Sequence, residues 1–123
     1  MIGIDEVDAA KLPTELSISA LTLAELSSGP HAVSDDLERA RRQDRIQRFE
    51  AEADVLAFES RCARAYGQVY AAVVATGRKA RGNRSVDLMI AATAIVHELP
   101  LYTLNPNDLH GLEGLIEIVD VSA

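Results

Sequence analysis

Three acidic side chains stand out because each lies at the edge of an apolar segment. Glu25 lies among leucines and an alanine, directly after a segment that alternates apolar and small polar residues. Asp87 lies in the first turn of an otherwise apolar helical pattern, and Asp108 closely follows another apolar segment. Carboxylates that lie close together raise one another's pKa unless a cation compensates them. If the fold gathers the three, they predict a site for Mg²⁺ or Mn²⁺, which prefer oxygen ligands and bind phosphates.

Each of these acids also has an ordinary structural explanation. Asp87 alone would interact favourably with the positive end of a helix dipole. Asp108 alone would be a turn residue, and Glu25 alone a residue at the rim of the core. Other chemistry finds less support, because the three histidines are scattered and no glycine-rich phosphate loop or serine nucleophile elbow is found. The single cysteine, Cys62, lies on an apolar helical stripe and is expected to be a packed thiol.

The elements that must position these acids follow from the apolar pattern. We expect strands at 16–21, 55–58, 101–104 and 116–121, and helices at 23–26, 37–53, 59–76 and 86–98. The expected helix caps are Thr22, Ser34, Ser85 and, at a C-terminus, Gly77. Strands that alternate with helices predict an α/β layered fold with a mainly parallel sheet. Ligands of such sheets bind beyond the carboxyl ends of the strands, where Glu25 and Asp108 are expected.

The charge pattern restricts how the protein meets nucleic acid. The chain has 123 residues, and its formal net charge is −7. A general nucleic-acid coat protein would be basic, so an RNA partner must be met through bound cations or a local basic patch. Residues 78–84 form the only strongly basic stretch that acids do not offset, with Arg78, Lys79, Arg81 and Arg84 as candidate contacts to an RNA backbone. The arginines of 37–53 alternate with acids and predict a solvated, salt-bridged face.

Length and composition favour one domain over residues 1–123 in a reducing cytoplasm. The chain is long enough for one real core, and a single cysteine excludes an intramolecular disulfide framework. The longest apolar run, 69–75, is too short to cross a membrane, and the N-terminus has no signal-peptide pattern. The helix around 62–74 carries more apolar surface than one small sheet covers. We therefore expect a homodimer, with Tyr66 and Tyr70 as amphipathic anchors.

Three segments of the chain, in this order, resemble the motifs of PIN-domain ribonucleases, and most closely those of the VapC toxins of bacterial toxin–antitoxin pairs. The segments are 19–26, 85–94 and 99–109, and the resemblance extends from about residue 16 to 121. It implies a compact three-layer α/β/α domain, homodimers, and inhibition by a cognate antitoxin protein. It also implies an endoribonuclease in which a divalent metal activates water to cleave RNA phosphodiester bonds.

The resemblance also assigns roles to individual residues. Glu25 falls at the family's acidic position after the second strand, and Asp87 at the acid that opens the helix reading Asp-Leu-Met-Ile-Ala-Ala. Asp108 falls at the acid of a Thr-x-Asn-x-x-Asp motif. Asn105 falls at a neighbouring catalytic position that is acidic in some members and Asn in others. Glu25, Asp87 and Asp108 are thus the implied ligands of Mg²⁺ or Mn²⁺.

The chain departs from the family pattern at its N-terminus. The family begins with an apolar strand that ends in an Asp, followed by a helix and more chain before the Glu, and here only 24 residues precede Glu25. We expect the first strand and its acid to be missing from the chain. The alternative is that Asp5, which directly follows Ile2-Gly3-Ile4, already serves as the fourth acid. The alternatives are a PIN-fold module that binds antitoxin or RNA without cleavage, and a non-nuclease α/β domain in which Glu25, Asp87 and Asp108 never meet.

Overall fold

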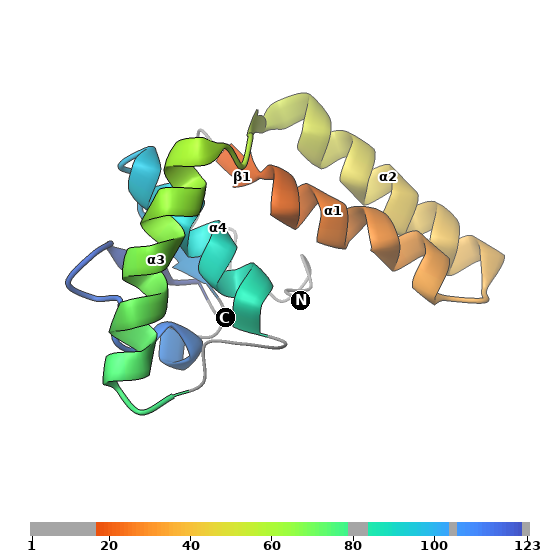
Figure 1. Ribbon diagram of the computed structural model, residues 1–123. Coiled ribbons are helices and arrows are strands. Elements are labelled where there is room, and N and C mark those ends of the chain that lie inside the picture. Colours follow the sequence, from red (N-terminus) through yellow and green to blue (C-terminus); the bar gives the residue numbers. More distant parts are fainter. Residues whose placement is uncertain (1–16, 79–83, 104–105, 122–123) are drawn as a thin grey trace. The chain divides into compact units, whose positions relative to one another are not determined.

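Helices and short strands alternate along the chain in the computed structural model (Figure 1). The structure describes residues 17–78, 84–103 and 106–121. The chain forms two compact units, which we describe separately. The hairpin unit is Pro13–Ala57, and the core unit is built on Phe58–Ala123. The expected first strand with Asp5 lies outside the described residues. The expectation of one domain over the whole chain stays a prediction.

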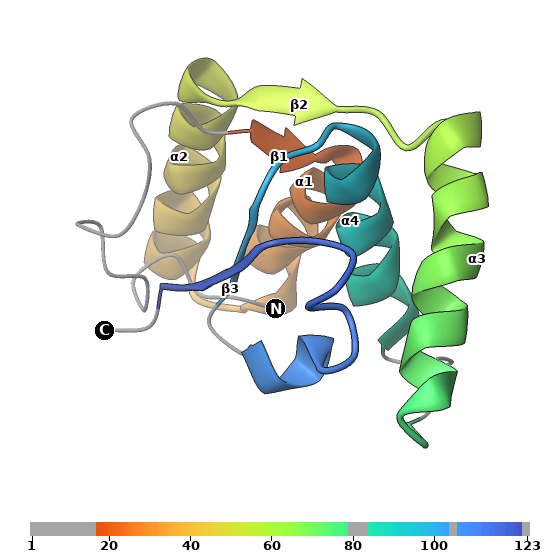
Figure 2. The ribbon, with the colours of Figure 1, turned by 90° about the vertical axis from the view of Figure 1, so that its left-hand side faces the viewer.

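The hairpin unit consists of two strands that flank a pair of helices. Its elements are β1 (Ser17–Ser19), α1 (Ala20–Ser28), the 3₁₀ turn η3 (Gly29–Ala32), α2 (Asp36–Glu52) and β2 (Asp54–Leu56). The strands β1 and β2 run parallel and side by side, with Ile18 paired with Val55 (Figure 2). The predicted strands at 16–21 and 55–58 are confirmed in position but are shorter than expected.

Two helix starts in this unit differ from the prediction. Ser19, rather than Thr22, caps α1, because its hydroxyl oxygen accepts the Thr22 backbone N–H at 3.0 Å. The apolar alternation that suggested a longer strand therefore continues into a helix. Asp35, rather than Ser34, caps α2 through a carboxylate oxygen that accepts the Glu38 N–H at 3.1 Å. A carboxylate at this position caps the helix and also complements its dipole.

The exposed face of α2 is salt-bridged, as predicted. Arg42 contacts Glu38 at 3.2 Å and Arg48 contacts Asp44 at 2.7 Å, both at a spacing of four residues. Such exposed pairs each stabilise a helix only slightly. Ile46 is the one buried residue of α2. The sequence from 36 to 52 thus folds as a helix that is mostly solvated.

The core unit pairs two long helices with two short strands. Its elements are α3 (Ser60–Ala75), α4 (Ser85–Val96), β3 (Leu101–Thr103), the 3₁₀ turn η5 (Pro106–Leu109) and β4 (Ile118–Asp120). The strands β3 and β4 run parallel, with Tyr102 paired with Val119. The predicted elements are confirmed, except that Ser85 is not a cap. The cap position is Arg84, whose backbone is already helical, so Ser85 lies inside the first turn.

The apolar core of this unit lies between α3 and α4 and the turns that follow. Helix α3 contributes Val69 and Val73, and α4 contributes Leu88 and the small residues Ala91 and Ala92. The small side chains let the two helix backbones approach closely, as the alanines at 91 and 94 predicted. Leu109 and Leu112, in and after η5, complete the same cluster. Both candidate acids of this unit are therefore carried by elements that the core holds in place.

The turn after η5 lies directly against α3. Gly111 has a φ of +101°, and a Cβ at this position would lie 2.7 Å from Cγ2 of Thr76 and 3.1 Å from the carbonyl oxygen of Ala72. Glycine is therefore required both by the left-handed backbone and by the close approach.

Among the described residues, no helix has both the length and the apolar character needed to cross a membrane.

Candidate active site

Asp87 lies in the first turn of α4 and is half-buried. Its desolvation raises the pKa of this carboxyl above the ordinary aspartate value, and the negative charge of Asp108 raises it further. The positive charge of Arg84 acts in the opposite direction and lowers it. The negative charge of Asp108 therefore lies near enough to act on the carboxyl of Asp87.

Asp108 lies on η5, shortly after β3, and its side chain faces solvent. Two contacts hold this turn. Leu109, the next residue, is buried in the core of the unit. On the other side, the guanidinium of Arg78 donates a hydrogen bond to the backbone carbonyl of Asn107. The position of Asp108 is thus fixed by an apolar anchor and a polar one.

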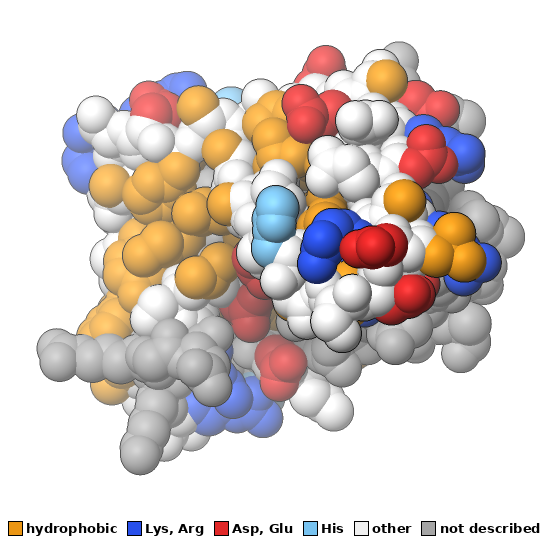
Figure 3. Space-filling model, turned by 90° about the vertical axis from the view of Figure 1, so that its right-hand side faces the viewer, with side chains coloured by type: hydrophobic (Ala, Val, Ile, Leu, Met, Phe, Trp, Pro, Cys, Tyr) orange, Lys and Arg blue, Asp and Glu red, His pale blue; other side chains and the backbone are white. Residues whose placement is uncertain are grey.

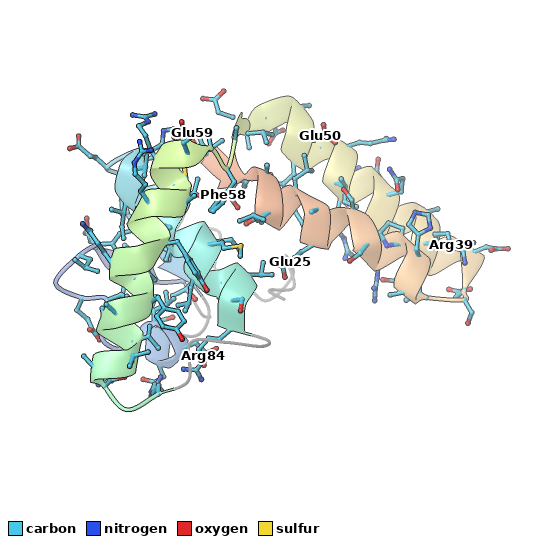
Figure 4. The ribbon with its side chains drawn as sticks, viewed as in Figure 1. Glu25, Arg39, Glu50, Phe58, Glu59 and Arg84 are labelled. Atoms are coloured by element: carbon cyan, nitrogen blue, oxygen red, sulfur yellow. The ribbon has the colours of Figure 1, made fainter. Side chains whose placement is uncertain are left out.

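Glu25 is half-buried on α1, one helix turn before Ser28. The Ser28 hydroxyl donates to the Glu25 backbone carbonyl at 2.6 Å, and the carboxylate projects from the side of the helix (Figure 4). The placement after β1 agrees with the sequence prediction. Glu25 belongs to the hairpin unit, whereas Asp87 and Asp108 belong to the core unit. The convergence of all three stays a prediction, and Asn105 lies outside the described residues.

The donor set of the core unit fits a divalent cation. Within either unit, the described residues contain no group of three Asp, Glu, His or Cys side chains that is ready to hold a metal. The pair of Asp87 and Asp108 nevertheless has the right chemistry, because two carboxylates that repel each other gain from a cation between them. Their hard oxygen atoms match the preference of Mg²⁺ and Mn²⁺.

Arg84 and Arg78 have different surroundings although both come from the predicted basic stretch. One guanidinium nitrogen of Arg84, Nη1, is buried and has no hydrogen-bond partner in the described part of the chain. Arg84 lies at the start of α4, beside Asp87 in sequence (Figure 4). Arg78 instead holds η5 through Asn107. Lys79 and Arg81 lie outside the described residues.

Sequence reasoning missed the contact between Arg78 and Asn107. The two residues are 29 positions apart, so neither periodicity nor a local motif connects them. The basic run around Arg78 was itself the only available signal, and it suggested RNA binding. The structure shows that at least one of its cations has a positioning role.

The sequence of this chain is similar to those of known proteins. The PIN domain family matches residues 4–110, a range that includes all four predicted site residues. The ribonuclease VapC5 of Mycobacterium tuberculosis is 30% identical over 118 residues, which cover 94% of this chain and 84% of that protein.

Solved structures agree as well. The crystal structure of VapBC-5, a toxin–antitoxin system from Mycobacterium tuberculosis, contains a chain that is 29% identical and matches with a TM-score of 0.81, over 98% of this chain and 91% of that one. A DNA-bound VapBC from Salmonella typhimurium contains a chain that is 28% identical, with a TM-score of 0.65 over 83% of this chain and 72% of that one. The α/β fold with parallel strands is therefore confirmed, and the chain belongs to the PIN-domain family as a homologue of the VapC ribonucleases.

Proposed function

We propose that this protein is a divalent-metal-dependent endoribonuclease and the toxin of a toxin–antitoxin pair. The observation that carries the proposal is the half-buried carboxyl of Asp87 at the start of α4, on which the charge of Asp108 in η5 acts, in a chain of the PIN-domain family. Glu25, on the hairpin unit, is the third proposed ligand of Mg²⁺ or Mn²⁺. When bound, such an ion supplies a water of lowered pKa and neutralises charge on the scissile phosphate.

The side chains of the protein have three tasks in this mechanism. Glu25, Asp87 and Asp108 would hold the ion, and a cation beside Asp87 would offset the desolvation that raises the pKa of its carboxyl. Asn105 is proposed to orient the reacting water through its amide. Arg84 is proposed to hold the RNA backbone, because it carries a positive charge at the start of α4, in the same helix turn as Asp87.

The proposed partners are an RNA substrate and a cognate antitoxin protein. The matched crystal structures are of VapBC toxin–antitoxin systems, which supports an antitoxin for this chain too. We place the protein in the cytoplasm, since the chain has a single cysteine and therefore no intramolecular disulfide framework of the kind that secreted proteins use.

We also propose a homodimer through α3. Tyr66 and Tyr70 pack beside the core with ring centroids 6.2 Å apart, and Val74 is 49% exposed on the same helix. Hydrophobic side chains gather over α3 and α4 on the face in Figure 3. Val74→Asp is expected to yield monomers in a dilution series by size-exclusion chromatography, whereas Gln68→Asp, at an exposed position of α3, leaves the dimer intact. A parent protein that is monomeric at micromolar concentration contradicts the proposal.

RNA cleavage and metal binding test the enzymatic proposal together. Asp87→Asn is expected to abolish Mg²⁺-dependent cleavage, because one anionic ligand is lost. Asp36→Asn is the matched control, because Asp36 lies in the first turn of α2 as Asp87 does in α4, and its side chain is 97% exposed. Equal cleavage by Asp87→Asn and the parent contradicts the mechanism. Saturable Mg²⁺ binding without any cleavage by the parent favours the binding module.

Asp5→Asn separates the two explanations of the N-terminus. If Asp5 is the fourth acid, this variant loses cleavage to a similar degree as Asp87→Asn. If Asp5 has no part in the site, the variant cleaves RNA like the parent. Asp8→Asn, three residues further along the chain, controls for the loss of one negative charge in the same segment.

A further inference from the structure

The core unit contains a hollow at the C-terminal end of α4. Its volume is about 430 Å³, within the range of ordinary binding pockets. Six of its eight lining residues have apolar side chains and the other two are acids, and polar and apolar atoms contribute about equally to its exposed surface. The lining residues are Ala94, Ile95, Glu98, Leu99, Pro100, Leu115, Ile116 and Glu117. Leu99 and Leu115 remain 38% and 40% exposed. We call this hollow the α4 groove.

Backbone hydrogen bonds fix the walls of the α4 groove. The N–H of Leu99 donates to the carbonyl of Ala94 at 3.0 Å, and the N–H of Glu98 donates to Ile95 at 3.1 Å, the two bonds of a Schellman turn. On the opposite wall, the N–H of Ile116 donates to Leu112 at 3.1 Å. The N–H of Leu101 then joins the two walls through the carbonyl of Glu117, at 2.8 Å. The groove is therefore formed before any partner binds.

Glu98 occupies a position where glycine would be the favoured residue. Its φ is +54°, and among the described residues it is the only non-glycine residue with a positive φ. A left-handed backbone is less stable for a residue with a Cβ than for glycine. The Schellman turn alone therefore does not account for a glutamate here. Backbone strain of this kind is found more often at functional sites than elsewhere.

The charges of the α4 groove are of one sign. Both of its ionisable lining residues, Glu98 and Glu117, are acidic, and both are exposed. In the described part of the chain, neither carboxylate forms an ion pair. An occupant that brings positive charge to this rim and an apolar group to Leu99 and Leu115 would satisfy both features of the groove.

We propose that the α4 groove binds a segment of a partner protein in which apolar side chains are flanked by Arg or Lys. The apolar side chains would lie against Leu99 and Leu115, and the cations beside Glu98 and Glu117. Helix α4 separates this groove from Asp87, because Asp87 lies in its first turn and its 12 residues span about 18 Å. Binding here leaves Asp87, at the other end of α4, uncovered and does not depend on the proposed nuclease activity.

Fluorescence anisotropy with a defined peptide tests the proposal on the full chain. The probe is a fluorescein-labelled peptide with two leucines between pairs of arginines, and the control peptide has glutamates in place of the arginines. We expect saturable binding of the first peptide only. The double variant Glu98→Gln, Glu117→Gln is expected to bind about tenfold more weakly, from the loss of two exposed charge pairs. The control Glu50→Gln, Glu52→Gln removes the same net charge from α2 and is expected to bind like the parent.

The apolar half of the proposal needs its own variants. Leu115→Ser is expected to weaken binding of the arginine-containing peptide. Leu37→Ser, at a leucine of α2 that is 60% exposed, is expected to leave that binding unchanged. Circular dichroism verifies that each variant is folded. Absence of saturable peptide binding overturns the proposal. An equal loss of affinity in the groove double variant and in the α2 control double variant overturns it as well. Competition by spermidine as strong as by unlabelled peptide, with no effect of Leu115→Ser, also overturns it, since the groove would then bind a small cation.

Discussion

The hairpin unit and the core unit are stabilised in different ways. In α1 no residue is buried, and in α2 only Ile46 is. The turn η3 is held by arginines of α2: Arg39 donates to the carbonyls of Pro30 and Val33, at 3.1 and 2.9 Å, and Arg42 donates to Gly29 at 3.1 Å. The core unit instead has an apolar cluster shared by two helices and the turns after them.

This difference bears on the proposed site, whose acids are divided between the two units. Asp87 and Asp108 lie on elements anchored by buried leucines, whereas Glu25 lies on a helix without a buried residue. Regions with few buried apolar contacts open at lower free energy than well-packed cores. We therefore expect the element that carries Glu25 to be the more easily perturbed part of the site.

Truncation of a core leucine is expected to have the largest effect. Leu88 on α4 is fully buried, so Leu88→Ala should lower the free energy of unfolding by about 2–5 kcal/mol. Leu37→Ala on α2 removes the same atoms from an exposed side chain and should change stability by less than about 0.5 kcal/mol. Urea unfolding of both variants measures the contrast. Equal losses would mean that the two units do not differ in how they are stabilised.

A side chain at Gly111 is expected to disturb the contact between the turn after η5 and α3. Gly111→Ala places a methyl group 2.7 Å from Cγ2 of Thr76 on a left-handed backbone, at a cost of about 1–3 kcal/mol. Thr76→Ser removes Cγ2 and should recover part of that loss in the double variant, but not all of it, because the carbonyl of Ala72 and the φ angle remain. A double-mutant cycle by thermal unfolding measures the recovery. Strict additivity would show that the two residues do not meet.

Removal of Arg39 is expected to affect the hairpin unit alone. Arg39→Met keeps most of the aliphatic stem and loses the hydrogen bonds to Pro30 and Val33, which together are worth about 1 kcal/mol. Hydrogen exchange should accelerate around 29–33 and stay unchanged in α3 and α4. Arg41→Met, whose exposed side chain makes only a 3.8 Å ion pair, is the control. Faster exchange in the core unit would show that the two units open together.

The pH dependence of stability is expected to have opposite signs at two carboxyls of the core unit. Burial raises the pKa of Asp87 in the folded state, so the folded protein binds the proton more tightly than the unfolded chain. The stability that this provides is present below the ordinary aspartate pKa, about 3.9, and is lost as the pH rises through the folded value. Asp87→Asn should therefore gain stability relative to the parent as the pH rises toward neutrality in the absence of divalent metal.

Glu113 provides the matched comparison. Hydrogen bonds from its own backbone N–H and from that of Gly111 hold the pKa of its carboxyl below the ordinary glutamate value. The stability that ionised Glu113 provides is present above the ordinary glutamate pKa and is lost as the pH falls through the lower pKa of the folded state. Glu113→Gln should therefore be less stable than the parent near neutrality. Thermal unfolding at several pH values measures both variants. The same sign of pH dependence at the two positions would contradict the assignment of these environments.

The sequence predicted the order and type of the elements but not their ends. Apolar periodicity placed α3 within one residue, because its stripe is long and its end is marked by Gly77, whose φ is +81°. The caps of α1 and α2 were misplaced because several small polar residues stand together there, and only the backbone decides which one accepts the N–H. Fold topology predicts that Glu25, Asp87 and Asp108 converge, and this stays a prediction, whereas the contact of Arg78 with Asn107 joins residues that no local pattern relates.

The parallel pairing of β1 with β2 has a consequence for the route of folding. Parallel neighbours cannot be joined by a tight turn, so the whole of α1, η3 and α2 is the crossover that connects them. The strands meet only after this long segment has closed, and loop closure of that kind limits folding rates. Helices that form early shorten the effective loop. The carboxylate of Asp35, which stabilises the start of α2, therefore also favours closure of this crossover.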